Sequence, residues 1–218
     1  MTATINHHPS DEVLLSYSAG GLAEAFNLMI ATHVSLCDEC RARVDAFDTL
    51  GGVLLDNGDV ETADVGADAL AKTLAMIKDG DPTPSMRKKS IPGVLPQPLQ
   101  DYVGGDLEAI KWRSVGMGVK QAILPTSKEA SARLLYIPAG AAMPDHGHRG
   151  LEMTMVLQGA FLDDGERFGR GDVETADCEL EHTPIADFGE DCICLAVTDA
   201  PLKFNSLIPR LAQPFLRI

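Results

Sequence analysis

Two groups of histidine, cysteine and carboxylate residues in this chain have the spacing of metal ligands. The first group contains His33, Cys37 and Cys40. His33 and Cys37 are four residues apart, so their side chains would share one face at the end of a helix. Cys37 and Cys40 form a Cys-x-x-Cys pair, and thiolates combined with imidazole in a tetrahedral set are typical of structural zinc sites. These residues predict a zinc site that needs one more ligand.

His7 and His8 are the candidates for the fourth ligand, because they are the other histidines in the first 80 residues. His8 precedes Pro9, which biases its backbone toward an extended conformation just before the first expected helix. The alternative interpretation is a pair of unligated cytosolic thiols near a chance histidine. A thioredoxin-like redox pair is disfavoured, because no strand precedes the Cys-x-x-Cys motif.

The second group lies in the C-terminal half and contains His146, His148, Glu152 and His182. The first three have even numbers, so on one strand they would point to the same face. Three imidazoles and one carboxylate suit zinc, iron, manganese or nickel, and the choice among these metals stays open. The group predicts a second site, for zinc or another divalent metal.

The sequence around these ligands resembles the two motifs of cupin β-barrels. Gly, five residues, His-x-His, three residues, Glu, six residues and Gly occur in order over residues 140–159. The second cupin motif places a histidine eleven residues after a glycine, and Gly171 and His182 have that separation. Asp177 and Glu179 replace the proline and glycine that are usual between them. The resemblance implies that the four ligands converge inside one barrel.

The first 80 residues must supply the helices that carry the first group. Their apolar residues recur at helical spacing, which predicts four helices: residues 11–17, with Ser10 as the N-cap, then 22–35, 38–55 and 66–78. Residues 80–99 then hold five prolines, a density that predicts neither helix nor central strand. We interpret this stretch as a semi-rigid linker.

From residue 100 onward, short β-branched and apolar runs alternate with turn residues, as in 120–124, 132–137, 151–157 and 192–197. Many short strands predict a sandwich or a barrel. We therefore predict an α + β chain with two domains. These are a small helical zinc-binding domain at residues 1–80 and a cupin β-barrel, or double-stranded β-helix, at residues 100–218. Residues 81–99 form the proline-rich linker between them.

The chain is acidic, with a net charge of −14. Residues 1–80 carry 13 acidic and 4 basic side chains, so this part is the more acidic per residue. Phosphate binding needs a basic surface, which argues against nucleic acid as a direct ligand and favours a basic protein partner. The N-terminus lacks the basic and apolar regions of a signal peptide, and no apolar run is long enough to cross a membrane. We expect a cytoplasmic protein.

The histidine, Cys-x-x-Cys and upstream-histidine pattern on a helical N-terminal domain resembles the zinc-binding anti-sigma factors of bacteria. Its combination with a cupin half is similar to the ChrR family of these proteins, on residues 31–43, 144–152 and 204–206. The resemblance carries zinc ligation to His8, His33, Cys37 and Cys40.

Membership would imply a regulator and not an enzyme. The helices would bind a group IV, extracytoplasmic-function-type sigma factor in a 1:1 complex and block its access to RNA polymerase. Singlet oxygen would release the sigma factor, with the cupin half as the sensor. The rival interpretation is a cupin metalloenzyme, a dioxygenase or hydrolase, with an N-terminal docking domain. The zinc motif on acidic helices favours the regulator, because a free cupin enzyme has no need of it.

Cys192 and Cys194 form a further pair whose role the sequence leaves open. They are two residues apart on an expected strand, so they share a face. They would be either a redox pair or buried core cysteines, and the core role is the commoner one.

Overall fold

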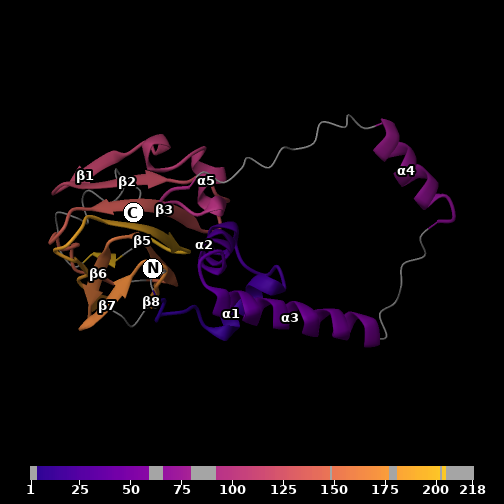
Figure 1. Cartoon of the computed structure of the whole chain (residues 1–218), viewed down its shortest axis with the longest axis horizontal. Helices are drawn as coiled ribbons and strands as arrows, with labels where there is room; N and C mark the ends of the chain where they lie inside the picture. The colour runs from indigo at the N-terminus through magenta and orange to yellow at the C-terminus, as the bar shows by residue number, and fades with distance from the viewer. Residues whose placement is uncertain are drawn as a thin grey trace.

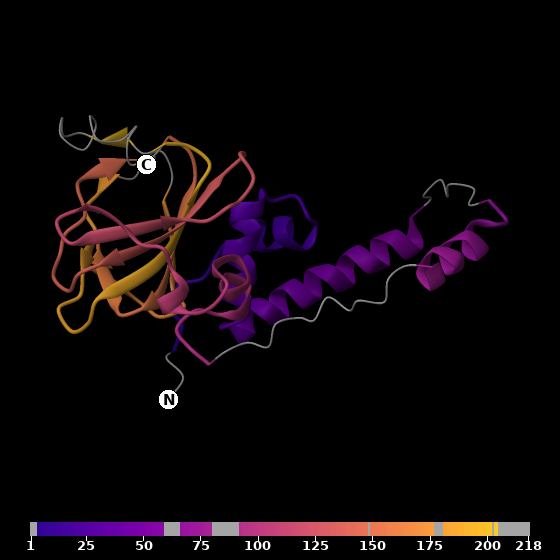
Figure 2. The same cartoon turned by 90° about the horizontal axis from the view of Figure 1, so that it is seen from above.

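The computed structural model describes residues 4–58, 66–79, 92–147, 149–176, 181–201 and 203–204. Helices α1, α2, α3 and α5 gather at one flank of a β-structure, with α2 between the sheet and α1 and α3 (Figures 1 and 2). The helices are α1 (Asp11–Ser18), α2 (Glu24–Val34), α3 (Asp38–Asn57), α4 (Ala69–Asp79) and α5 (Gln97–Val103), and a 3-10 turn, η1, spans Leu107–Ala109.

The four predicted N-terminal helices are confirmed, with ends within three residues of the expected ones. Ser10 caps α1, and its side chain accepts a hydrogen bond from the backbone N–H of Val13. The prediction for the proline-rich stretch was wrong at its end, because α5 begins at Gln97. Pro98 occupies the first turn of that helix, where a missing N–H costs no intrahelical hydrogen bond. Residues 80–91 lie outside the part that the structure describes.

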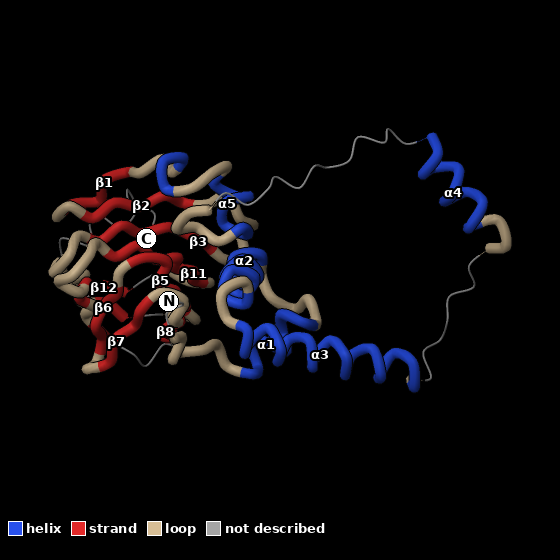
Figure 3. The backbone as a smooth tube through the Cα atoms, viewed as in Figure 1, coloured by secondary structure: helices blue, strands red, loops and turns tan. Residues whose placement is uncertain are grey.

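The C-terminal half consists of short strands, as predicted (Figure 3). In chain order these are β1 (Arg113–Gly116), β2 (Val119–Ile123), β3 (Ser131–Ile137), β4 (His146–Gly147), β5 (Glu152–Gln158), β6 (Ala160–Asp163), β7 (Glu166–Gly169), β8 (Val173–Ala176), β9 (Glu181–His182), β10 (Ile185–Ala186), β11 (Cys192–Thr198) and β12 (Lys203–Phe204). One sheet has the order β1-β2-β3-β11-β5-β8, and two smaller sheets have the orders β10-β6-β7 and β12-β4-β9. The α + β fold class with a C-terminal cupin-like domain is confirmed.

The central strand β11 separates two hydrophobic cores. Cys192 and Cys194 face the barrel interior, where they pack with the aromatic pair Phe161 and Phe168. Ile193, Leu195 and Val197, which alternate with them, face outward. These outward residues pack in one cluster with buried residues of α2: Ala25, Phe26, Leu28, Met29 and Ile30.

The helical part and the barrel therefore share a hydrophobic core, and α2 covers the outer face of the largest sheet. The sequence pattern predicts two parts joined by a linker alone, without this shared core. One face of a barrel strand normally meets solvent, but all seven residues of β11 are buried. Its outward-facing side chains are therefore covered by another element, which is α2. No helix among the described residues is long and apolar enough to span a membrane.

Candidate metal centres

The first predicted ligand set comes together where α2, α3 and the chain before α1 meet the barrel. Ligand atoms of His8, His33, Cys37 and Cys40 all lie within 4.8 Å of one another. Nδ1 of His8 is 3.5 Å from Sγ of Cys37 and 3.3 Å from Sγ of Cys40. Ligands around tetrahedral zinc are separated by about 3.5 Å, given bonds of about 2.0 and 2.3 Å. The spacing therefore fits a zinc ion.

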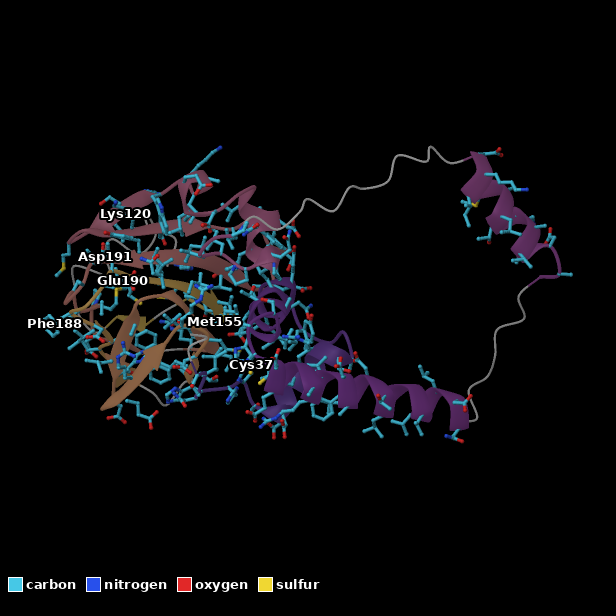
Figure 4. The ribbon with its side chains drawn as sticks, in the orientation of Figure 1. Cys37, Lys120, Met155, Phe188, Glu190 and Asp191 are labelled. Atoms are coloured by element: carbon cyan, nitrogen blue, oxygen red, sulfur yellow. The ribbon has the colours of Figure 1, made fainter. Side chains whose placement is uncertain are left out.

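The backbone at the junction of α2 and α3 places three of these ligands. His33 is in the last turn of α2, and its carbonyl accepts the backbone N–H of Cys37. Cys37 is the N-cap of α3, and its Sγ accepts the N–H of Cys40 at 3.4 Å. Figure 4 shows Cys37 at the flank of the barrel, opposite Phe188 at the other end.

His33 is oriented for metal binding. Its side chain is fully buried, and Nδ1 lies 2.9 Å from the carbonyl oxygen of Gly171, so Nδ1–H is the donor. Nε2 is also buried and has no hydrogen-bond partner among the described residues. Burial lowers the pKa of His33 to about 4, so the imidazole is neutral, the form that ligates metals. A zinc ion would satisfy Nε2.

The structure also distinguishes the two N-terminal histidines. His8 points to the cysteines, and its Nε2 lies 3.8 Å from a carboxylate oxygen of Glu39. His7 points to the barrel, where its ring packs on Phe168 and Nε2 lies 3.1 Å from Glu166. Neighbouring residues of an extended segment face opposite sides, so only His8 joins the set.

Burial of Cys40 and the nearby Cys37 raise the pKa of the Cys40 thiol to about 12. A thiol of this kind binds zinc only as the thiolate, so metal binding there would release a proton. Affinity for zinc should consequently fall as the pH is lowered, since protons compete for the same sulfur.

The second predicted set is only partly within the described residues. His182 is buried in the barrel, and its electrostatic interaction with Glu152 places the two near each other. The backbone of His146 pairs with that of His182 across β4 and β9. His148 lies outside the described residues, and so does the His146 side chain. Metal binding by this set therefore stays a prediction.

The prediction that one strand carries both His146 and Glu152 was wrong, because β4 ends at Gly147 and β5 begins at Glu152. The backbone of His146 instead pairs with that of His182 on β9, while Glu152 begins β5 and pairs with Ala176 of β8.

Two acidic residues that the sequence analysis missed lie beside His182. Nδ1 of His182 is 2.7 Å from Asp163 and 3.8 Å from Glu174, and all three residues are buried. Their ligand atoms lie within 4.8 Å of one another. A signal was present for Glu174, which lies between the β-branched residues Val173 and Thr175. Asp163 precedes Asp164 and Gly165, a pair typical of turns, so the local sequence indicates only a turn there.

This cluster is electrostatically unusual. Burial raises the pKa of Glu152 to about 7, although His182 and Arg133 act against it. Burial lowers the pKa of His182, but the neighbouring carboxylates of Glu174 and Asp163 outweigh this and raise it to about 9. Asp163 accepting from Nδ1 would leave Nε2 of His182 as the ligand atom, as in many metal-bound histidines.

Cys192 and Cys194 are buried free thiols, with Sγ atoms 3.9 Å apart. Hydrogen bonding to Cys192 and burial raise the pKa of Cys194, and Glu174 and Glu152 contribute through their charge. The Cys194 thiol is therefore protonated, and both cysteines pack in the barrel core, which agrees with the core interpretation.

Comparisons with known proteins agree with these features. Residues 100–202 match the family model described as the ChrR cupin-like domain. The chain is 58% identical to the anti-sigma-E factor ChrR of Cereibacter sphaeroides over 217 residues, 99% of this chain and 100% of that protein. The crystal structure of Rhodobacter sphaeroides SigE in complex with the anti-sigma ChrR matches 90% of this chain and 100% of the aligned one. Their sequence identity is 55% and the TM-score is 0.79.

The relationship covers both the helical part with its histidine and cysteine cluster and the cupin barrel. It confirms the interpretation of the chain as a regulator over that of a cupin enzyme. This chain belongs to the ChrR family of anti-sigma factors.

Proposed function

We propose that this chain binds and inhibits an extracytoplasmic-function-type sigma factor, and that its cupin half relieves the inhibition in response to singlet oxygen. The proposal rests on the family and on exposed apolar side chains of the helices. The related ChrR was crystallised with SigE, which supports a sigma factor as the partner here. A zinc ion at His8, His33, Cys37 and Cys40 would hold the helices together as a structural metal.

The single observation that carries the partner is the exposed apolar surface of α3 and α4. No residue of α4 is buried, although Leu70, Leu74 and Ile77 recur on one face of it. The second half of α3 likewise exposes apolar side chains: Leu50, Val53, Leu54 and Leu55. An apolar helix face of this kind is suited to a groove on a partner protein.

The charge of the helical part suits the same partner. Its excess of acidic residues would complement basic surfaces that a sigma factor uses to bind DNA. Opposite charges raise the rate of encounter, and salt screens them beyond about 10 Å at 0.1 M. The apolar face would then supply most of the affinity.

We expect the full chain to form a 1:1 complex with an extracytoplasmic-function-type sigma factor from the same organism. Size-exclusion chromatography with light scattering gives the stoichiometry, and calorimetry at two salt concentrations gives the affinity. Added salt should weaken binding through a slower association rate. A primary, housekeeping-type sigma factor is the control. Failure of all such sigma factors to bind would contradict the proposal.

The cupin half is proposed as the sensor because the barrel that encloses its buried polar cluster packs directly against α2. His146, His148, Glu152 and His182 would hold zinc or another divalent metal, with Asp163 orienting His182. Loss of one oxidised ligand would change the barrel that supports α2. Shifting a complex from 99% to 1% bound requires a free-energy change of about 5.5 kcal/mol. Loss of the binding free energy of a metal ion can supply a change of that size.

We expect His182→Ala to abolish the transcriptional response to singlet oxygen while basal inhibition stays close to wild type. The reason is that His182 lies inside the barrel, away from the exposed faces of α3 and α4. A reporter gene under the sigma factor, with and without a photosensitiser, measures both quantities. The double variant Cys192→Ser/Cys194→Ser should keep a transcriptional response to singlet oxygen closer to that of the wild type. A normal response of His182→Ala would place the sensing elsewhere.

A further inference from the structure

We propose that residues 169–173 of the cupin domain form the outer coordination shell of the N-terminal metal site. The site would then reach its full metal affinity only while the barrel is docked against the helices. This inference rests on the proposed zinc site, and it concerns residues that lie at least 129 positions from the ligands in sequence.

The first contact is made to the ligand His33. Its Nδ1–H donates to the carbonyl oxygen of Gly171 at 2.9 Å, a contact between two residues 138 positions apart. This hydrogen bond sets the tautomer and the ring orientation, and it leaves Nε2 as the nitrogen that His33 can offer to the cluster with the cysteines. Metal-bound histidines use such a carbonyl or carboxylate partner to fix the ligand nitrogen. In this chain the partner belongs to the barrel and not to the helical part.

The second contact holds the segment that carries His8. Oδ1 of Asp172 accepts the backbone N–H of Asn6 at 2.6 Å and that of His7 at 3.0 Å. The N–H of Val173 donates to the carbonyl oxygen of His7 at 3.1 Å. The segment before α1 is therefore attached to the start of β8, one residue before the ligand. Because His8 is flanked by this attachment and by Pro9, its position depends on the barrel.

The turn itself is closely packed and well defined. Gly171 has φ +92°, a conformation that favours glycine, and a Cβ there would lie 2.6 Å from Ile5. Oδ2 of Asp172 accepts the N–H of Gly169 at 2.7 Å and closes the turn. Asp172 is 2% exposed, so its carboxylate is committed to these hydrogen bonds. One carboxylate thus joins the turn to the N-terminal segment.

The same segment continues into the barrel interior. Glu174 directly follows Val173 in β8 and lies 3.8 Å from His182. The two candidate metal centres are therefore separated by one short strand that contacts both.

The test compares zinc and cobalt binding by full-length wild type, Asp172→Ala and Asp187→Ala. Asp187 is a matched control, because it is an acid of the same domain that pairs with Arg167. Cobalt reports on this site through thiolate-to-metal absorption, with Cys37→Ser/Cys40→Ser as the blank. Competition with a chelator gives the zinc affinity. We expect Asp172→Ala to weaken zinc binding about tenfold and to alter the cobalt spectrum, whereas Asp187→Ala should match wild type.

His7→Ala is a second variant that keeps the backbone hydrogen bonds of residue 7 and the Asp172 carboxylate, and removes the contacts of the imidazole with Phe168, Glu166 and Asp172. It should also weaken zinc binding, by a smaller factor. Wild-type affinity in folded Asp172→Ala and in His7→Ala would overturn the outer-shell role. Absence of thiolate-to-cobalt absorption in the wild type would instead refute the zinc site itself, so the two failures are distinguishable.

Discussion

Replacing both Cys37 and Cys40 by serine is expected to remove one zinc per chain and to unfold the junction of α2 and α3. Cys37 is the N-cap of α3, and Cys40 is fully buried beside it. Serine at position 37 can still cap the helix, so the change acts by removing two metal ligands. Structural zinc contributes about 10–16 kcal/mol of apparent binding free energy in zinc-finger peptides at pH 7. That exceeds the total stability of many domains, about 5–15 kcal/mol.

Metal analysis of the purified full chain measures the first effect, and amide hydrogen exchange measures the second. Exchange should increase through the first three helices, while β3, β5 and β11 keep most of their protection. The matched control is Cys192→Ser/Cys194→Ser, which changes two buried thiols outside the site. It should keep the same zinc content as wild type. A double variant at Cys37 and Cys40 that retained its zinc and its helices would show that no metal binds there.

The second large effect is expected on α4. Replacing Leu70, Leu74 and Ile77 together by alanine should weaken sigma-factor binding by at least ~100-fold. Burying one such side chain contributes about 1.5–3 kcal/mol, and alanine retains only a small part of that. A loss of about 3 kcal/mol over the three positions corresponds to that factor. Alanine is a strong helix former, and all three side chains are exposed, so the free chain should keep its stability.

Lys72→Ala is the control for this experiment, because Lys72 lies on the opposite face of α4 and forms an ion pair with Asp68. It should change the affinity by less than about threefold, as exposed ion pairs contribute about 0–1 kcal/mol. Calorimetry with the purified sigma factor gives the dissociation constants, and circular dichroism checks the helix. Equal affinities for the triple variant and the wild type would exclude α4 from the interface.

The sequence by itself determined the features that depend on neighbours along the chain. His33, Cys37 and Cys40 are close in sequence, so a helix end and an N-cap bring them together without help from distant residues. The helices could be predicted for the same reason, since capping and apolar spacing are local. The cupin-type motifs also identified the barrel, although the strand through His146 was wrongly taken as continuous.

Only the tertiary structure decided the features that depend on packing between distant segments. His8, and not His7, faces the cysteines because hydrogen bonds to the start of β8 fix the orientation of the extended segment. Asp163 and Glu174 became neighbours of His182 through barrel closure, which no spacing in the sequence expresses. The core shared by α2 and β11 arises in the same way. Such contacts depend on how whole elements dock, and docking is set by the summed burial of many side chains rather than by any local pattern.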